Sequence, residues 1–481
     1  TGVQWCALPI SSQNLAVGKF STSVRDRHYL SLRYGWDGNN QPNGAGLRSA
    51  PSAWATSTNA FHSFNANDSW ILGRQVFNES VIQLQTFRNE IPGAIDRPSL
   101  MFPNGVTAGA NPNAPQATEQ RKWQLRHDTS WTVDSGPGLG HTLKAGVNWI
   151  HEPRLFISTK SGVAGFFTMA ANDVNGPVQQ VQVIGGAAET NIPLDVVGLY
   201  AQDDWKVSRR LSVNLGLRWD VVTGMPIDQS RSPNFAVMQA AGARGRFEGT
   251  PLADFGQSTR PDRNNLQPRI GFTFDTRGNG RDIIRGGWGV YTDFAYTNTN
   301  ALTASIDAAG GAGIVFFAQN PTGLRRADGA FFRATDPLSS IAALNTVDRS
   351  LPPLAGQVVS PRLQQPYSRQ ASLGIVHALD ESTTITADVV RVDGRDLNMR
   401  LRLNALVNGR RNFADLPIQP NSFAFRTAVS GGTSLYQAAI IGFDRRLTRG
   451  LDVTASYTAS TSSSNAGAAV DDLDANVIQD V

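Results

Sequence analysis

Ten residues, Ser212–Val221 (SVNLGLRWDV), decide the fold of this chain, because apolar and polar residues alternate along them without a break. Side chains of a β-strand point alternately to its two faces, so the stretch predicts a strand with one apolar and one polar face. The apolar face carries Val213, Leu215, Leu217, Trp219 and Val221, and the polar face carries Ser212, Asn214, Gly216, Arg218 and Asp220.

The same alternation recurs along the chain. Other clear examples are Tyr29–Trp36, Leu143–Trp149, Gln267–Phe274 and Leu451–Tyr457. About ten residues is the length at which a tilted strand crosses a bilayer. An antiparallel sheet with one wet face alternates in the same way, so the pattern alone does not require lipid.

The connections between these segments alternate between short and long. Short turns rich in Gly, Asp and Asn lie near 24–27, 73–76, 134–140, 206–210, 276–281, 379–382 and 447–450. Long spans rich in Pro, Gly, Asn and Ser occupy 37–60, 89–120, 154–194, 226–265, 295–366 and 395–433. Strict alternation of tight turns and long loops is typical of outer-membrane barrels and is unusual in a compact soluble domain.

We therefore predict an all-β chain, an antiparallel transmembrane β-barrel of the outer-membrane type. About fourteen strands are expected, centred near 14–23, 28–36, 61–71, 77–88, 122–133, 141–152, 195–206, 211–224, 266–275, 283–294, 368–378, 383–393, 434–446 and 451–461. If the short turns face the periplasm, the first strand runs inward and the last runs outward. We therefore expect the chain to be part of a larger barrel.

Composition excludes other classes of protein. Charged residues make up only 17% of the 481 residues, and no run approaches the roughly 18 apolar residues of a membrane helix. The net charge is +4, but arginines are scattered along the whole chain, so no nucleic-acid partner is expected. A single cysteine, Cys6, excludes an internal disulfide. The sequence begins TGVQWCALPI, without a signal peptide, which also suggests a fragment.

Four segments resemble the barrel of TonB-dependent receptors, specifically the Oar-like branch with a carboxypeptidase-regulatory-like N-terminal domain. They are Gly198–Arg218, Asn265–Tyr291, Gln365–Leu379 and Tyr436–Tyr457. The resemblance implies a 22-stranded barrel with an internal plug, a TonB box before the plug, and uptake of a large or scarce solute with energy from the inner membrane. Neither plug, regulatory-like domain nor TonB box maps onto residues 1–481, which we interpret as one partial barrel domain.

Eight polar residues on the wet face of the expected strands are the candidate site residues. They are Arg33, Lys144, Arg218, Asp220, Arg269, Arg285, Asp388 and Asp452. Facing the lumen, they would contact solute or plug, or form cross-strand ion pairs in a wet interior. We favour the structural role, because a polar lumen is required whatever the cargo. Six tryptophans (Trp123, Trp131, Trp149, Trp205, Trp219 and Trp288) suit interfacial belts, and core packing is the alternative.

No enzymatic or cofactor motif emerges. The six histidines form no HExxH motif, and there is no G-x-S-x-G, P-loop or dinucleotide fingerprint. Asp472, Asp474 and Asn476 have the opening spacing of a calcium loop, but Val477 stands where that loop needs Gly and no closing Glu follows, so a solvated loop is the preferred interpretation. We expect no enzyme, cofactor or metal.

The resulting prediction is a receptor-transporter barrel in the outer membrane. Its partners would be outer-membrane lipid, an unknown solute, and the TonB complex acting through a plug outside this sequence. Residues 295–366 are the expected ligand-contacting surface, with Gly310, Gly311 and Gly313 beside Ile314–Phe317 as a mobile apolar tip. The alternatives are a passive porin or surface adhesin, and a soluble, secreted β-rich binding protein.

Overall fold

The computed structural model describes residues 11–25, 27–223, 227–230, 233–243, 245, 248, 259–293, 302, 305–306, 314–343, 356–404, 406–407, 410–411, 413–416, 425–447 and 450–466. Cys6, Gly310, Gly311, Gly313 and the calcium-like residues Asp472, Asp474 and Asn476 lie outside them.

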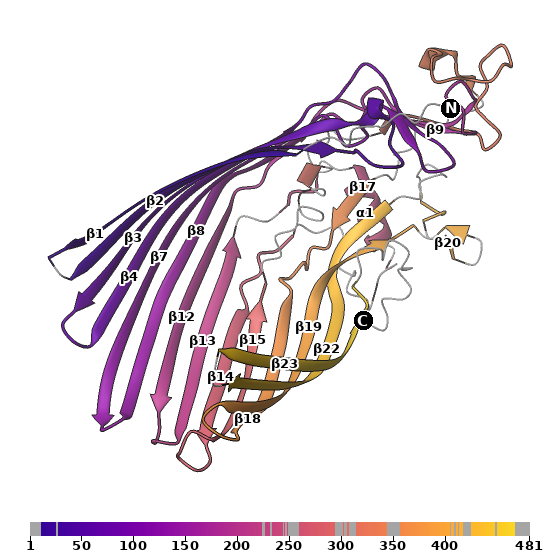
Figure 1. Ribbon diagram of the computed structural model, residues 1–481. Coiled ribbons are helices and arrows are strands. Elements are labelled where there is room, and N and C mark those ends of the chain that lie inside the picture. Colours follow the sequence, from indigo (N-terminus) through magenta and orange to yellow (C-terminus); the bar gives the residue numbers. More distant parts are fainter. Residues whose placement is uncertain are drawn as a thin grey trace.

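The main element is a curved sheet of sixteen strands (Figure 1). Fourteen long strands follow one another in chain order, each antiparallel to the next. They are β1 (Ser12–Val24), β2 (His28–Asn43), β3 (Ala55–Leu72), β4 (Val76–Ile91), β7 (Gln116–Gly136), β8 (Leu139–Thr159), β12 (Leu194–Lys206), β13 (Leu211–Thr223), β14 (Asn265–Asp275), β15 (Asp282–Thr292), β18 (Tyr367–Ala378), β19 (Thr383–Arg402), β22 (Phe425–Leu447) and β23 (Leu451–Ser464). Each coincides with one expected segment, and several are longer.

Two short strands complete this sheet. β11 (Ala188–Asn191) pairs with β8, and β17 (Gly356–Val359) pairs in parallel with the first four residues of β22, Phe425–Ala428. Within the described residues β1 and β23 do not pair with each other, so the sheet is not closed into a barrel. The tight turns lie at one end, here the turn end, and the long connections lie at the other, the loop end.

The register places the expected apolar residues on one side of the sheet, here the apolar face. Leu217 of β13, for example, lies opposite Ala201 and Pro268 of the neighbouring strands. Large apolar side chains of this face are 37–56% exposed; they include Leu143, Val147, Leu199, Leu215, Leu217, Ile270, Leu373, Ile375, Val389 and Ile441. So much exposed apolar area on regular strands requires an apolar surrounding.

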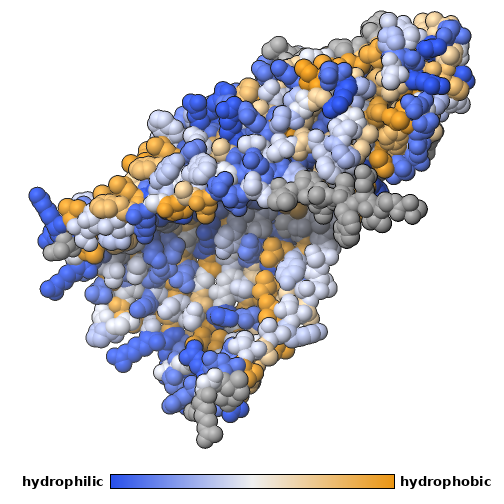
Figure 2. Space-filling model, turned by 45° about the horizontal axis from the view of Figure 1, so that its top comes forward, coloured by the Kyte–Doolittle hydropathy of each residue, from blue (hydrophilic) through white to orange (hydrophobic). Residues whose placement is uncertain are grey.

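The other side, the polar face, is concave. The Tyr200 hydroxyl donates to Asp128 Oδ1 at 2.6 Å although β8 separates their strands. Arg285 and Asp388 likewise meet across β18, at 3.0 Å. Side chains from strands two apart converge only on the inside of a curved sheet. Figure 2 shows the hollow that this curvature leaves below the loops.

The long connections are folded rather than structureless. A second, five-stranded sheet combines β5 (Ser99–Met101), β6 (Thr107–Gly109), β9 (Phe166–Met169), β10 (Val178–Ile184) and β16 (Ile314–Gln319). We call this element the loop sheet. Its core is fully buried and contains Met169, Val178, Val181, Ala318, Leu324 and Phe332.

The expectation of a mobile apolar tip at Ile314–Phe317 is therefore wrong. These residues belong to β16, which pairs with β10 in the loop sheet. Phe316 packs against the core of this sheet, and Ala318 is part of that core. Backbone pairing with β10 and the packing of Phe316 therefore hold in place the segment that was expected to be a mobile tip.

A second packed group of loops lies beside β17. Helix α1 (Pro233–Ala243) contributes Met238, which packs with Val358, Leu401 and Phe413. The buried Gln229 side chain hydrogen-bonds to both the N–H and the C=O of Val359, completing the backbone pairing of β17. The remaining short elements are η1 (Pro51–Ala53), η2 (Leu338–Ser340), β20 (Leu406–Val407) and β21 (Arg410–Arg411). In the described part of the chain no helix has the length and apolar character needed to cross a membrane.

Candidate functional site

All eight expected residues lie on the polar face. Arg33 of β2 stands opposite Lys19 and Asn65, and Asp452 of β23 stands opposite Arg446. The other six are Lys144 (β8), Arg218 and Asp220 (β13), Arg269 (β14), Arg285 (β15) and Asp388 (β19). These six side chains fall into three groups, of which the second contains only Lys144 from the expected set.

The first group runs across β13, β14 and β15. Arg218 and Asp220 form an ion pair of 2.7 Å, and the Gln267 amide donates to the same Asp220 carboxylate. Arg269 donates to Gln267 Oε1 at 3.1 Å. The Arg269 guanidinium also lies 4.5 Å from the ring centre of Tyr291, within cation–π distance. Asp220 and Gln267 are almost fully buried, so this chain of contacts satisfies polar groups removed from solvent.

The second group centres on Asp204 of β12. Lys144 Nζ lies 2.8 Å from Asp204 Oδ2. Gln202 and Asn214 donate to Asp204 Oδ1 at 2.9 and 2.6 Å. One carboxylate therefore connects β8, β12 and β13.

The third group is the ion pair between Arg285 and Asp388. The two side chains meet through 3.0 and 3.1 Å contacts to the two carboxylate oxygens. They pass over Gly374 of β18, where any Cβ would collide with Asp388. Gly146 of β8 similarly leaves room for Asp128 and Tyr200. Glycine on the middle strand is therefore what allows side chains two strands apart to meet.

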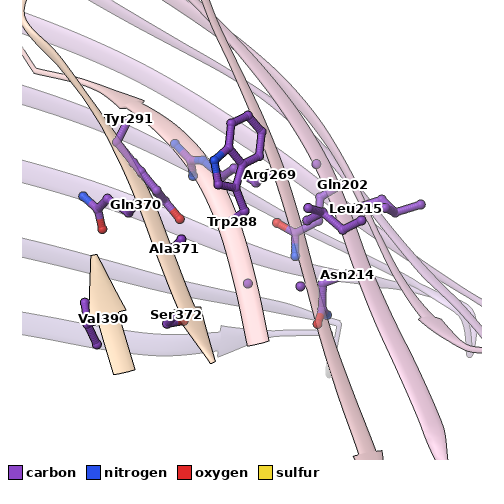
Figure 3. A pocket seen from close by; sticks show the side chains of 14 residues that line it. Gln202, Asn214, Leu215, Arg269, Trp288, Tyr291, Gln370, Ala371, Ser372 and Val390 are labelled. Atoms are coloured by element: carbon purple, nitrogen blue, oxygen red, sulfur yellow. The ribbon is translucent and has the colours of Figure 1, made fainter. Parts of the chain in front are cut away.

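A cavity of about 360 Å³ lies beside the first two groups (Figure 3). Its polar lining is Gln202, Asn214, Arg269, Tyr291, Gln370 and Ser372; glycines 216, 271 and 287 and apolar residues such as Trp288 form the rest of its wall. These groups offer amide and phenol hydrogen bonds with one guanidinium. Such a wall suits contact with a neutral or anionic polar surface.

The partner residues could not be named from the sequence. Asp204, Gln267 and Tyr291 lie on expected strands, but only the register shows which residue each one faces. The segment around Asp204 has polar residues on both faces, which hid its orientation. Among the described residues no group of three or more His, Cys, Asp or Glu side chains could hold a metal ion.

Structural comparison finds longer proteins with a similar fold, among them an outer membrane transporter. The outer membrane transporter YddB from Escherichia coli is similar with a TM-score of 0.57 at 12% identity, over 94% of this chain and 48% of that one. The siderophore receptor PirA from Acinetobacter baumannii gives 0.54 at 13%, over 94% and 53%. PirA from Pseudomonas aeruginosa gives 0.51 at 10%, over 94% and 57%. At these identities the likeness concerns the fold, and the chain spans about half the length of these proteins.

Comparison of sequences gives the family. A search of curated proteins finds no match. The family model described as "Outer membrane beta barrel domain" matches residues 7–481, nearly the whole chain. This match agrees with the exposed apolar face, the polar concave face and the order of the strands. The chain belongs to the family of outer membrane β-barrel domains, and its location is the outer membrane.

Proposed function

We propose that this chain forms the barrel wall of a receptor that takes up a large or scarce solute with TonB-coupled energy. The turn end faces the periplasm and the loop end faces the outside. A plug encoded beyond these residues fills the lumen, and the eight polar residues with their partners line it. The similarity in fold to an outer membrane transporter and a siderophore receptor about twice as long supports this proposal, as does the resemblance to the Oar-like branch.

The observation that carries the proposal is the ordered loop sheet above the hollow. Passage of small solutes alone does not require loops with a buried core of their own, whereas recognition does, because rigid support positions the contacting residues. Phe332 is fully buried in that core and lies 6.1 Å from Phe167, ring centre to ring centre. The neighbouring Phe331 is instead exposed, under the Arg325 guanidinium at 3.5 Å.

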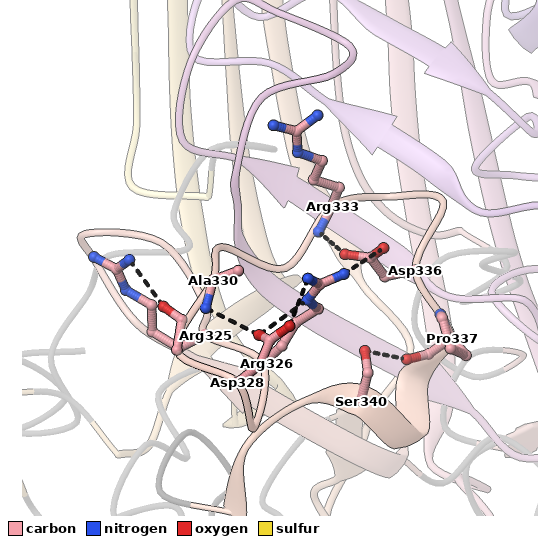
Figure 4. Close-up of polar contacts among 9 residues, drawn as sticks. Arg325, Arg326, Asp328, Ala330, Arg333, Asp336, Pro337 and Ser340 are labelled. Carbon is pink, nitrogen blue, oxygen red and sulfur yellow. Dashed lines mark hydrogen bonds and ion pairs between the residues drawn. The ribbon is translucent and has the colours of Figure 1, made fainter.

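We place the ligand-contacting surface within 295–366 on the segment around Arg326 (Figure 4). Arg326 pairs with Asp328 at 2.7 Å and with Asp336 at 3.4 Å. The backbone amide of Ala330, followed by the Arg326 guanidinium, lowers the pKa of Asp328. These contacts hold charged and aromatic groups in a fixed arrangement at the surface, which suits a ligand with both polar and flat apolar parts.

A conductance measurement distinguishes the proposed plugged receptor from its main alternative, a passive porin. The full-length gene product is inserted into a planar bilayer with potassium chloride on both sides. A plugged receptor gives no steady conductance, whereas a passive porin gives a stable ohmic one. Steady conductance of the native protein would overturn energised transport.

An adhesin barrel is the other alternative, and TonB binding separates it from a receptor. The periplasmic domain of TonB from the same organism, immobilised on resin, is expected to retain the full-length protein from detergent extract. Deleting the TonB box from the full-length protein should abolish retention. Failure of the intact protein to bind would favour the adhesin.

A further inference from the structure

Tryptophan side chains mark the turn-end boundary of the apolar face. Trp70, Trp131 and Trp205 lie near the turn end of their strands, whereas Trp149 is the central residue of β8 and lies nearer the loop end than they do. Trp149 stands opposite Val197, eight residues before Trp205 on β12. Eight residues extend about 26 Å along a strand, or about 20 Å across the bilayer at a tilt of about 40°. Lipid headgroups therefore meet the apolar face at the level of Trp205.

Three histidine–aspartate pairs lie at this level on the same face. His28 Nδ1 is 3.1 Å from Asp68. His141 Nδ1 is 2.8 Å from Asp203, and His377 Nδ1 is 2.6 Å from Asp282. Each histidine lies within three residues of the turn-end terminus of its strand. Each pair joins two adjacent strands, and together they recur at three places around the sheet.

Two of the pairs share a further feature. His28 stacks on Trp70 with ring centres 5.0 Å apart and planes at 16°. His141 stacks on Trp205 at 5.4 Å and 13°. In the third pair Arg277 takes the place of tryptophan, with Nε 2.9 Å from Asp282. Carboxylate, imidazole, and an indole or guanidinium thus occur together at each place.

The geometry leaves one nitrogen of each ring for an outside partner. In all three pairs Nδ1 faces the carboxylate, which fixes the ring, so Nε2 is the remaining polar atom. The histidine side chains are 38%, 33% and 45% exposed. In its imidazolium form the ring donates from Nε2, and the nearby aspartate balances its charge.

We propose that His28, His141 and His377 each bind the phosphodiester of a phospholipid headgroup through Nε2. The level of the tryptophans and the exposed apolar band directly adjoining each pair favour lipid as the source of the phosphate. Stacking on tryptophan orients the rings of His28 and His141, and in all three pairs the aspartate holds Nδ1. The three sites fix the depth and rotation of the sheet in the periplasmic leaflet, an assignment that uses the orientation proposed above.

Solid-state NMR tests the contact directly. The full-length protein, with ¹⁵N-labelled histidine, is reconstituted in phosphatidylethanolamine, and dephasing of imidazole nitrogens by ³¹P is measured. Nε2 of these three rings is expected to dephase and Nδ1 to dephase much less. Single His→Phe variants, which keep an aromatic ring against tryptophan, assign each signal. Absence of ³¹P dephasing at all three Nε2 atoms would overturn the proposal.

His127 provides the matched control. It lies on the same face but in the middle of β7, with Nδ1 2.9 Å from Ser80 Oγ and Nε2 3.3 Å from Thr129 Oγ1. Its nitrogens should not dephase, and His127→Phe should leave the other signals unchanged.

Lipid counting gives an independent readout. The affinity of each site for phosphatidylethanolamine, measured by native mass spectrometry, should fall about tenfold in the His→Phe variants, as the loss of a hydrogen bond to a charged group predicts. A phosphate-free galactolipid with the same acyl chains should bind equally to native protein and variants. Equal loss of both lipids would mean that the histidines only shape the surface. If the native protein bound TonB but showed no headgroup contacts, the lipid sites would be refuted while the proposed receptor function would stand.

Discussion

Single glycines decide where the polar face can form bridges between strands two apart. Gly374 and Gly146 each lie under a pair of side chains from the strands on either side, and Gly198 lies under Arg218 and Asp220 of the next strand. Gly35, also on the polar face, has no atom within 4 Å of where a Cβ would lie. The same residue type thus has a defined packing role at some positions and open space at others.

A comparison of valine substitutions tests this role. Gly374→Val should displace Asp388 and break its ion pair with Arg285, lowering the free energy of unfolding by about 1–3 kcal/mol. Gly35→Val should change it by less than about 0.5 kcal/mol. Urea unfolding from lipid vesicles measures both. If both variants lost the same free energy of unfolding, the loss would come from replacing glycine by valine in any strand and not from the displaced ion pair.

Asp275, the last residue of β14 before the turn to β15, gives a pH-dependent prediction for the turn end of the sheet. Its carboxylate accepts hydrogen bonds at 2.7 Å from the backbone amides of Gly280 and Gly278. The bond from Gly280 is the main cause of its lowered pKa. Since the folded pKa lies below the unfolded value of about 3.9, the stabilisation is present above that value and is lost as the pH falls through the folded pKa.

Amide proton shifts of Gly278 and Gly280 report this titration. They should move together as the pH is lowered from about 6 to about 2, with a midpoint below about 3.9. In Asp275→Asn the movement should disappear. A midpoint at or above the ordinary aspartate value would contradict the assigned cause.

At the scale of elements, the loop sheet should lose its fold without loss of the main sheet. Its core is separate from the membrane strands and contains Phe332, whereas Phe331 lies at its surface. Phe332→Ala should destabilise the loop sheet by about 3–5 kcal/mol, and Phe331→Ala should have little effect on stability. Limited proteolysis should cut the loops only in the Phe332 variant, while heat-modifiable gel migration persists in both. Loss of heat modifiability would show that the two sheets fold as one unit.

The membrane strands could be predicted from the sequence, and the loop sheet could not. Each long strand carries its own alternating signal, as in Ser212–Val221, and each pairs with its neighbours along the chain. The strands of the loop sheet are three to seven residues long, and β10 pairs with β16 across four intervening membrane strands. Such short segments carry too little periodicity, and their partners are determined by tertiary packing. Similarly, the orientation of Arg218 followed from alternation, but the contacts of Lys144 with Asp204 required the register.

For the whole molecule, an added charge should destabilise the protein far more on the apolar face of the sheet than on the polar face. Leu373 and Ser372 are adjacent on β18, on the apolar and polar faces respectively. Leu373→Arg should cost about 2–4 kcal/mol in lipid, as expected for arginine facing the middle of a bilayer. Ser372→Arg, in the wet hollow, should cost less than about 1 kcal/mol. Folding equilibria in lipid vesicles measure the difference, and equal costs would contradict the lipid-facing assignment.

The pairing of β10 with β16 has a topological consequence. Five residue pairs join the connection that precedes β12 to the connection that follows β15. The chain from β10 through the four membrane strands β12, β13, β14 and β15 to β16 is therefore closed into a ring by the hydrogen bonds between β10 and β16. A molecule that passes through this ring is surrounded by protein. It leaves only by the way it entered, or after β10 and β16 have separated.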